Sequence, residues 1–159
     1  GTVGMEILNQ HGSPLHAIFV PVGGGGLIAG VSVYVKYLRP EVKVIGVEAD
    51  GSACMAAALA AKRRVTLPSD TLDQFADGTS VARVGKETFK IARRCVDEII
   101  VVSTDEICGA IKDIFDDTRS IAEPSGALAV AGMKKYVAAR GSEFGFANYE
   151  VQAVPSAPR

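Results

Sequence analysis

Residues 17–30, with the sequence AIFVPVGGGGLIAG, decide the fold that this chain predicts. An apolar run at 17–22 leads into four consecutive glycines at 23–26, and these lead into a segment with helical spacing at 27–38. A short β-branched run bounded by glycine is typical of a buried strand. The stretch therefore predicts a strand, a tight loop and a helix in direct succession.

The rest of the chain repeats this alternation of strand and helix. Two more β-branched runs, at 42–47 and 98–102, predict buried strands. Ser103 and Glu106 have the spacing of a capping box, in which each side chain bonds the other residue's amide at the start of a helix. Helices are predicted at 52–61, at 85–95, from Ser103 onward and from Pro124 to about Ala139. This order predicts an α/β fold built on a parallel sheet.

Length and composition limit the classes of protein that fit. A chain of 159 residues with 48% hydrophobic and 22% charged residues is expected to form one folded domain. A net charge of -1 disfavours nucleic acid and anionic membranes as partners, and no apolar stretch is long enough to span a bilayer. Cys54, Cys95 and Cys108 lack disulfide or zinc spacing, so we expect small buried residues in a reducing compartment.

The four glycines are the feature that points most directly to chemistry. Residues without Cβ let the backbone approach a ligand closely, and the first amides of the following helix have no partner within that helix. Such a loop suits an anion, above all a phosphate. A tight turn that binds nothing is the structural alternative. No Gly-Lys-Ser/Thr sequence follows, so the pattern of a nucleoside triphosphate hydrolase is not met.

A dinucleotide site is a second alternative. Gly24, Gly26 and Ala29 match the pattern G-x-G-x-x-A, and Glu48 follows the next strand, near the position of a ribose-binding acid. A nucleotide-binding α/β module without catalysis therefore stays open. The aperiodic segment at 66–80 is expected to be a long loop that lines the site, whichever ligand binds there.

Four separated stretches of the chain resemble one enzyme family. They are PVGGGGLIAG (21–30), VIGVEADGSACM (44–55), FADGTSV (75–81) and AEPSGALAVAGMKKY (122–136). Their order and spacing resemble threonine ammonia-lyase, also called threonine dehydratase, of the biosynthetic type. This family belongs to the fold-type II pyridoxal-phosphate enzymes, and the resemblance covers residues 1–140.

The resemblance implies a fold, a reaction and a setting. The fold is that of tryptophan synthase β-like enzymes, of which residues 1–140 resemble the C-terminal part of the catalytic domain. The reaction is the pyridoxal 5'-phosphate-dependent deamination of L-threonine to 2-oxobutanoate and ammonia, in isoleucine biosynthesis. The substrate is a small amino acid, threonine or serine, and the parent is a homo-oligomer in the cytoplasm or an organelle stroma. Serine dehydratase, serine racemase and threonine synthase are the alternatives within the same fold.

The resemblance also assigns residues to the cofactor. Gly78 and Glu123 match positions beside the cofactor ring, with a turn glycine and a charge at a helix N-terminus as their structural alternatives. Backbone amides are implied to hold the cofactor phosphate at Gly23, Gly24, Gly25, Gly26 and Leu27.

The chain also departs from the family in several places. None of its eight lysines stands in the serine, aromatic, lysine motif that forms the family's Schiff base, so no catalytic residue is assigned and the chain alone is expected to be inactive. Residues 141–159 match no family motif and are expected to form an irregular tail. Glu48 resembles a metal-binding carboxylate of serine racemases, but Ser52 and Cys54 stand at the partner positions, so no metal is expected.

Overall fold

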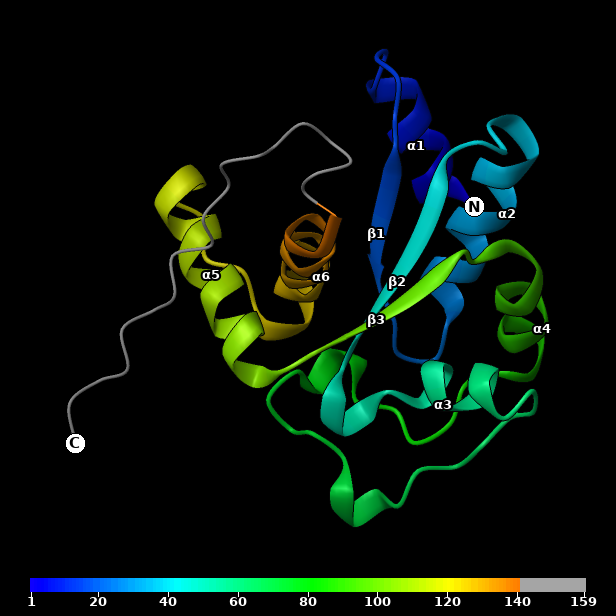
Figure 1. The fold of residues 1–159 in the computed structure, drawn as a ribbon, viewed down its shortest axis with the longest axis vertical. Helices are drawn as coiled ribbons and strands as arrows, with labels where there is room; N and C mark the ends of the chain where they lie inside the picture. Colours follow the sequence, from blue (N-terminus) through cyan, green and yellow to red (C-terminus); the bar gives the residue numbers. More distant parts are fainter. Residues whose placement is uncertain (141–159) are drawn as a thin grey trace.

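The computed structural model describes residues 1–140, which fold around a sheet of three parallel strands (Figure 1). The strands are β1 (Ala17–Pro21), β2 (Lys43–Ala49) and β3 (Glu98–Val102), and they lie side by side in that order. In the register, Phe19 pairs with Ile45, and Val47 pairs with Ile100. The parallel α/β fold and its three strands are thus confirmed. The tail predicted at 141–159 lies outside the described residues.

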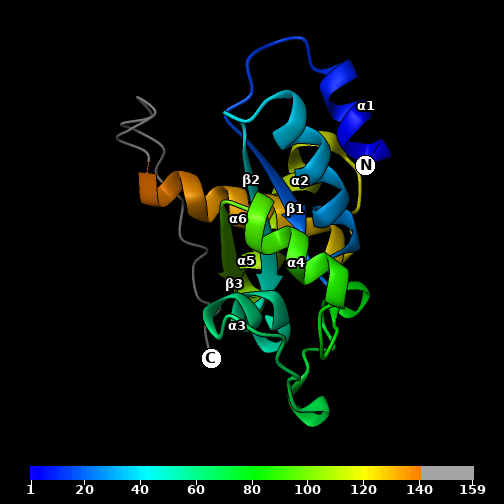
Figure 2. The ribbon, with the colours of Figure 1, turned by 90° about the vertical axis from the view of Figure 1, so that its right-hand side faces the viewer.

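Helices cover both faces of the sheet (Figures 1 and 2). One face carries α2 (Gly26–Leu38), α3 (Cys54–Ala60) and α4 (Lys86–Cys95), and α1 (Thr2–Gln10) packs against α2. The other face carries α5 (Thr104–Thr118) and α6 (Pro124–Arg140). None of these helices, within residues 1–140, combines the length and the apolar character needed to cross a bilayer.

Most helices follow the sequence predictions closely. The capping box of α5 is confirmed, because Ser103 Oγ accepts the Glu106 amide at 3.3 Å and Glu106 Oε2 accepts the Ser103 amide at 2.7 Å. The helix predicted at 52–61 is shorter, since Asp50–Ser52 forms a 3-10 turn before α3 begins. The predicted loop at 66–80 contains two short 3-10 turns, Ser69–Thr71 and Asp77–Thr79.

Both faces of β2 are buried in apolar cores. Val44 points into the core beneath α2, α3 and α4, while Ile45 and Val47 point into the core beneath α5 and α6. A central parallel strand covered on both sides reads as a continuous apolar run, which is why this segment was predictable. The expectation for the cysteines is only partly met, because Cys54 is buried but Cys108 is exposed on α5.

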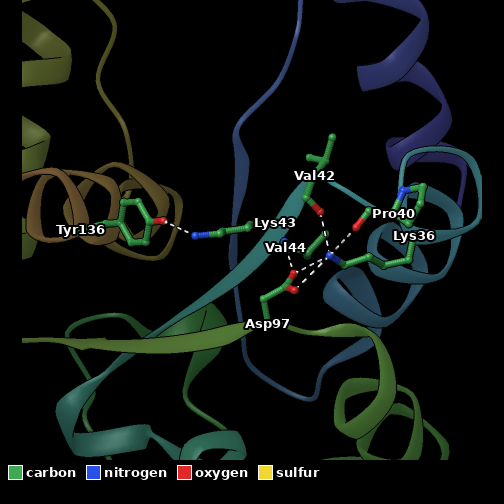
Figure 3. Close-up of polar contacts among 7 residues, drawn as sticks. All are labelled: Lys36, Pro40, Val42, Lys43, Val44, Asp97 and Tyr136. Atoms are coloured by element: carbon green, nitrogen blue, oxygen red, sulfur yellow. Dashed lines mark hydrogen bonds and ion pairs between the residues drawn. The ribbon is translucent and has the colours of Figure 1, made fainter. Parts of the chain in front are cut away.

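A polar cluster fixes the sheet at the end where β2 and β3 begin (Figure 3). Lys36 Nζ of α2 donates to the Val42 carbonyl at 2.8 Å and the Pro40 carbonyl at 3.3 Å, and pairs with Asp97 at 2.8 Å. Asp97 also accepts the Val44 amide at 2.7 Å. The cluster ties the end of α2 to the starts of two strands and holds their register.

Gly132 lets α6 lie close to the sheet. A Cβ built on Gly132 would overlap the Val47 side chain, which is fully buried in β2. Gly109 in α5 offers a contrast, because its nearest neighbour would be Lys134 Nζ at 3.9 Å. The two helical glycines therefore differ in the space around them.

We expect Gly132→Ala to destabilise the protein by about 1–3 kcal/mol through overpacking, despite the better helix propensity of alanine. The matched control Gly109→Ala should instead stabilise it by roughly 0.5–1 kcal/mol, because propensity acts there without a clash. Chemical denaturation measures both free energies of unfolding. Equal effects at the two positions would show that α6 does not depend on this close approach.

Candidate functional site

The four glycines form a loop between β1 and α2, at the carboxyl end of the sheet (Figure 1). Gly25 is the residue before α2, and its φ of 89° lies in the left-handed region that favours glycine. No side chain from residues 1–140 caps this end of α2, and its first turn contains no acidic residue. The amides of that turn keep their partial positive charge and have no partner inside the helix. An anion is the ligand that such an end attracts.

Two glycines of the loop lie close to protein neighbours. A Cβ on Gly25 would lie 2.7 Å from Met55 Cε and 3.0 Å from Thr88 Oγ1. A Cβ on Gly23 would lie 3.1 Å from the Thr79 carbonyl oxygen. The backbone of the loop therefore packs directly against α3, α4 and the Asp77–Thr79 turn.

The other two glycines have no such neighbours. A Cβ on Gly24 or Gly26 would meet no atom within 4 Å among the described residues. Among residues 1–140, Gly25 is also the only glycine with positive φ, so backbone strain does not explain Gly24 and Gly26. These two positions face open space beside the start of α2. Leu27 follows them and is 47% exposed.

Hydrogen bonds from α4 hold the loop in place. The Gly24 carbonyl accepts the Gly85 amide at 3.1 Å and the Thr88 hydroxyl at 2.8 Å. Gly85 and Thr88 lie in the helix predicted at 85–95, but no pattern in the sequence indicates a role for them. Helical periodicity shows which residues share a face, but it does not show that a helix start meets a distant loop.

The structure brings Gly78 and Glu123 together, although they are far apart in the sequence. A Cβ on Gly78 would lie 3.6 Å from Glu123 Oε1 and 3.0 Å from Ser125 Oγ. The next residue in the chain, Thr79, touches Gly23, so this pair adjoins the glycine loop. Sequence reasoning missed Ser125, whose buried hydroxyl has no hydrogen-bond partner within residues 1–140.

Glu48 is fully buried inside β2 and bonds the start of α3. Its two carboxylate oxygens accept the amides of Met55 and Ala56, each at 2.8 Å. Burial raises the pKa of Glu48 to about 7, and the two amide bonds only partly offset this rise. Burial, with the charge of Glu48, likewise raises the pKa of the Cys54 thiol to about 11.

This geometry bears on two roles considered for Glu48. Both oxygens are turned to α3 inside the protein, so they do not face a ribose outside the glycine loop. Nor does any group of three or more His, Cys, Asp or Glu residues within 1–140 have the arrangement of a metal site.

The lysines with side-chain partners bond residues outside the glycine loop. Their partners are acidic residues, Tyr136 and carbonyl groups of the sheet ends. The lysines concerned are Lys36, Lys43, Lys90, Lys112, Lys134 and Lys135. Lys62 and Lys86 are exposed, and Lys86 follows Gly85 at the start of α4.

We expect Glu48 to make stability depend on pH below neutrality. Its pKa is about 7 in the fold and 4.5 ordinarily, so between these values the folded state holds a proton that the unfolded state has released. The free energy of unfolding should therefore fall as the pH rises from about 4.5 to 7, by about 3 kcal/mol from this group.

The change Glu48→Gln removes the titrating group, so the difference in unfolding free energy between variant and wild type should change over this pH window. Urea denaturation at a series of pH values measures that difference. Parallel stability curves for the two proteins would contradict the raised pKa.

Comparison with known proteins places this site in a wider context. The family model described as pyridoxal-phosphate dependent enzyme matches residues 1–145. The biosynthetic L-threonine dehydratase of Burkholderia multivorans is 58% identical over 143 residues, which cover 90% of this chain and 28% of that protein. The mitochondrial threonine dehydratase of Saccharomyces cerevisiae is 56% identical, over 86% of this chain and 24% of that protein. The chain thus spans about a quarter of the length of these curated relatives.

A solved structure resembles the fold as well. The processed form of threonine deaminase isoform 2 from Solanum lycopersicum superposes with a TM-score of 0.84 at 45% identity. The match covers 88% of this chain and 40% of that one.

Proposed function

We propose a function from the premise that this chain belongs to the pyridoxal-phosphate-dependent enzyme family, whose model matches residues 1–145. Within that family, the protein to which these residues belong is a threonine dehydratase, which converts L-threonine to 2-oxobutanoate and ammonia in isoleucine biosynthesis. The relatives at 58% and 56% identity are threonine dehydratases, and they support this choice. The enzyme works in the cytoplasm or inside an organelle, as a homo-oligomer.

The observation that carries the proposal is the open space at Gly24 and Gly26. A structural turn explains Gly25 by its φ and Gly23 by its contact with Thr79, but it leaves the other two glycines unexplained. A ligand that packs onto the backbone explains them, because a side chain would occupy its place. The partial positive charge at the N-terminus of α2, whose first turn has no acidic residue, favours a negatively charged ligand there. The phosphate of pyridoxal 5'-phosphate fits both requirements.

The residues of this chain would then divide the work as follows. Amides of Gly23, Gly24, Gly25, Gly26 and Leu27 would bind the cofactor phosphate, and Gly78 with its neighbour Glu123 would stand beside the ring. Bound pyridoxal phosphate supplies an electron sink for the charge that develops on the amino acid. The exposed Glu123 carboxylate lies at the start of α6 and orients polar groups of the ring or substrate. Its position before Pro124 equally suits it to that helix end.

Substitutions in the loop test the phosphate site. Gly24→Ala should change the free energy of unfolding by less than about 1 kcal/mol, because its Cβ meets no atom of residues 1–140 within 4 Å. The same change should weaken binding of sulfate and of pyridoxal phosphate about tenfold, because the methyl group crowds the anion. Gly25→Val should lose binding and stability together, through backbone strain and overlap with Met55.

Titrations followed by NMR give these affinities, with exposed Lys62→Ala as the control that leaves them unchanged. If Gly24→Ala binds sulfate and cofactor with normal affinity, the loop is a structural turn and not a phosphate site. Saturable binding of NAD, without binding of pyridoxal phosphate, would favour the nucleotide-binding module instead.

We further expect the purified 159-residue chain to bind the cofactor without turning over L-threonine. None of its lysines has the sequence context of the family's Schiff-base residue, and six of the eight are bonded to residues outside the loop. An assay for 2-oxobutanoate, made on chain that is free of the expression host's own threonine dehydratase, checks this. Turnover by the chain alone would show that one of these lysines does act as the Schiff-base residue.

A further inference from the structure

The first turn of α3 lies directly beneath the glycine loop. Met55 Cε would be 2.7 Å from a Cβ on Gly25, which places the methionine side chain against the bare face of that glycine. Cys54 Sγ donates to the Gly23 carbonyl at 3.7 Å. Two adjacent residues of α3 thus support two glycines of the loop from below. Any movement of this turn would be passed to the loop through these contacts.

The first turn of α3 is held by a residue of the sheet. The helix has seven residues, and Ala53, which precedes it, offers no capping side chain. Glu48 of β2 supplies the missing acceptors, one oxygen for the Met55 amide and one for the Ala56 amide. A helix this short gains little from its own hydrogen bonds, so these two bonds matter for its position.

We propose that Glu48 is a positioning residue for the cofactor-phosphate site: its carboxylate fixes the first turn of α3, and this turn fixes the shape of the glycine loop. The inference rests on the proposed function only for the identity of the ligand. The linkage itself runs from a buried side chain of β2, through Met55 and Cys54, to Gly25 and Gly23.

The choice of a buried carboxylate supports this role over simple helix capping. A buried carboxylate is costly, as the pKa of about 7 shows, whereas the cap of α5 is built from Ser103 and Glu106, which are partly exposed. A single hydroxyl accepts one amide in a flexible geometry, but a carboxylate inside the sheet fixes two successive amides to a rigid strand. The buried carboxylate, which is the costlier of the two caps, is therefore found at α3, the helix that contacts the glycine loop.

Glu48→Gln is the variant that tests the proposal, because it keeps the size of the side chain but can accept from only one of the two amides. Ser103→Ala is the matched control, since it removes a cap from α5, and within residues 1–140 no α5 residue is among the close neighbours or hydrogen-bond partners of the loop glycines. Both are made in the full chain and studied at about pH 8, where wild-type Glu48 is ionised.

Two backbone amides report on the shape of the loop without any ligand. The Gly85 amide bonds the Gly24 carbonyl, and the Ala29 amide bonds the Gly25 carbonyl at 3.0 Å. In Glu48→Gln, hydrogen exchange of both amides should accelerate about tenfold beyond any change in global unfolding. Ser103→Ala should change neither beyond its effect on global stability. The dissociation constant for sulfate should rise about fivefold in Glu48→Gln and stay constant in Ser103→Ala.

The outcomes separate this inference from the proposed function. If exchange accelerates at Met55 and Ala56 but not at Gly85 and Ala29, Glu48 is a local cap and the inference is wrong, whatever the chain binds. If wild type binds neither sulfate nor pyridoxal phosphate, the proposed function fails, while the exchange data still decide whether Glu48 shapes the loop. If exchange at Gly85 and Ala29 is faster but sulfate affinity is unchanged, Glu48 shapes the loop without affecting how tightly the loop binds an anion, and the inference that it positions the phosphate site is wrong.

Discussion

At Gly23 and Gly25 the backbone of the glycine loop packs tightly against three other segments of the chain, and the whole site depends on this contact. Gly25 lies against Met55 and Thr88, and Gly23 lies against Thr79. These neighbours come from α3, α4 and the Asp77–Thr79 turn, so one loop joins parts of the chain that the sheet alone would not hold together. Because the contacts are made by backbone, a small change in any of the three segments alters the loop directly.

The same constraint links the loop to the rest of the site. Thr79 touches Gly23 on one side, while its neighbour Gly78 packs against Ser125 and Glu123 at the start of α6. The helix α6 is in turn held close to β2 by the contact between Gly132 and Val47. A strand order of β1-β2-β3 with helices on both faces therefore brings the candidate residues to one end of the sheet. Small residues at the contacts allow that arrangement.

Sequence reasoning predicted the elements well and their mutual contacts poorly. The run at 42–47, the glycines at 23–26 and the pair Ser103 and Glu106 carry local patterns, so the strand, the loop and the capping box were all predictable. Glu48 carries no such pattern, because its partners are amides at the start of a helix in another layer. Its place directly after the run at 42–47 indicates only that a strand ends nearby, and nothing in the sequence of its neighbours shows that it is buried or that it fixes α3.

The site residues show the same division. Gly78 and Glu123 came from a resemblance to a family, and their proximity appears only when the Asp77–Thr79 turn meets α6. Thr88 and Met55 were assigned to helices with no function, although they define the two walls around Gly25. Periodicity identifies buried faces but not which side chains meet across a layer.

The most direct measurement of the phosphate assignment is a crystal structure of this chain grown with pyridoxal 5'-phosphate. Phosphate density is expected within hydrogen-bonding distance of the amides of Gly24, Gly26 and Leu27, in the open space that Gly24 and Gly26 leave beside the start of α2. Cofactor bound elsewhere on the protein, with the glycine loop making no contact to its phosphate, would show that the loop is not the phosphate site.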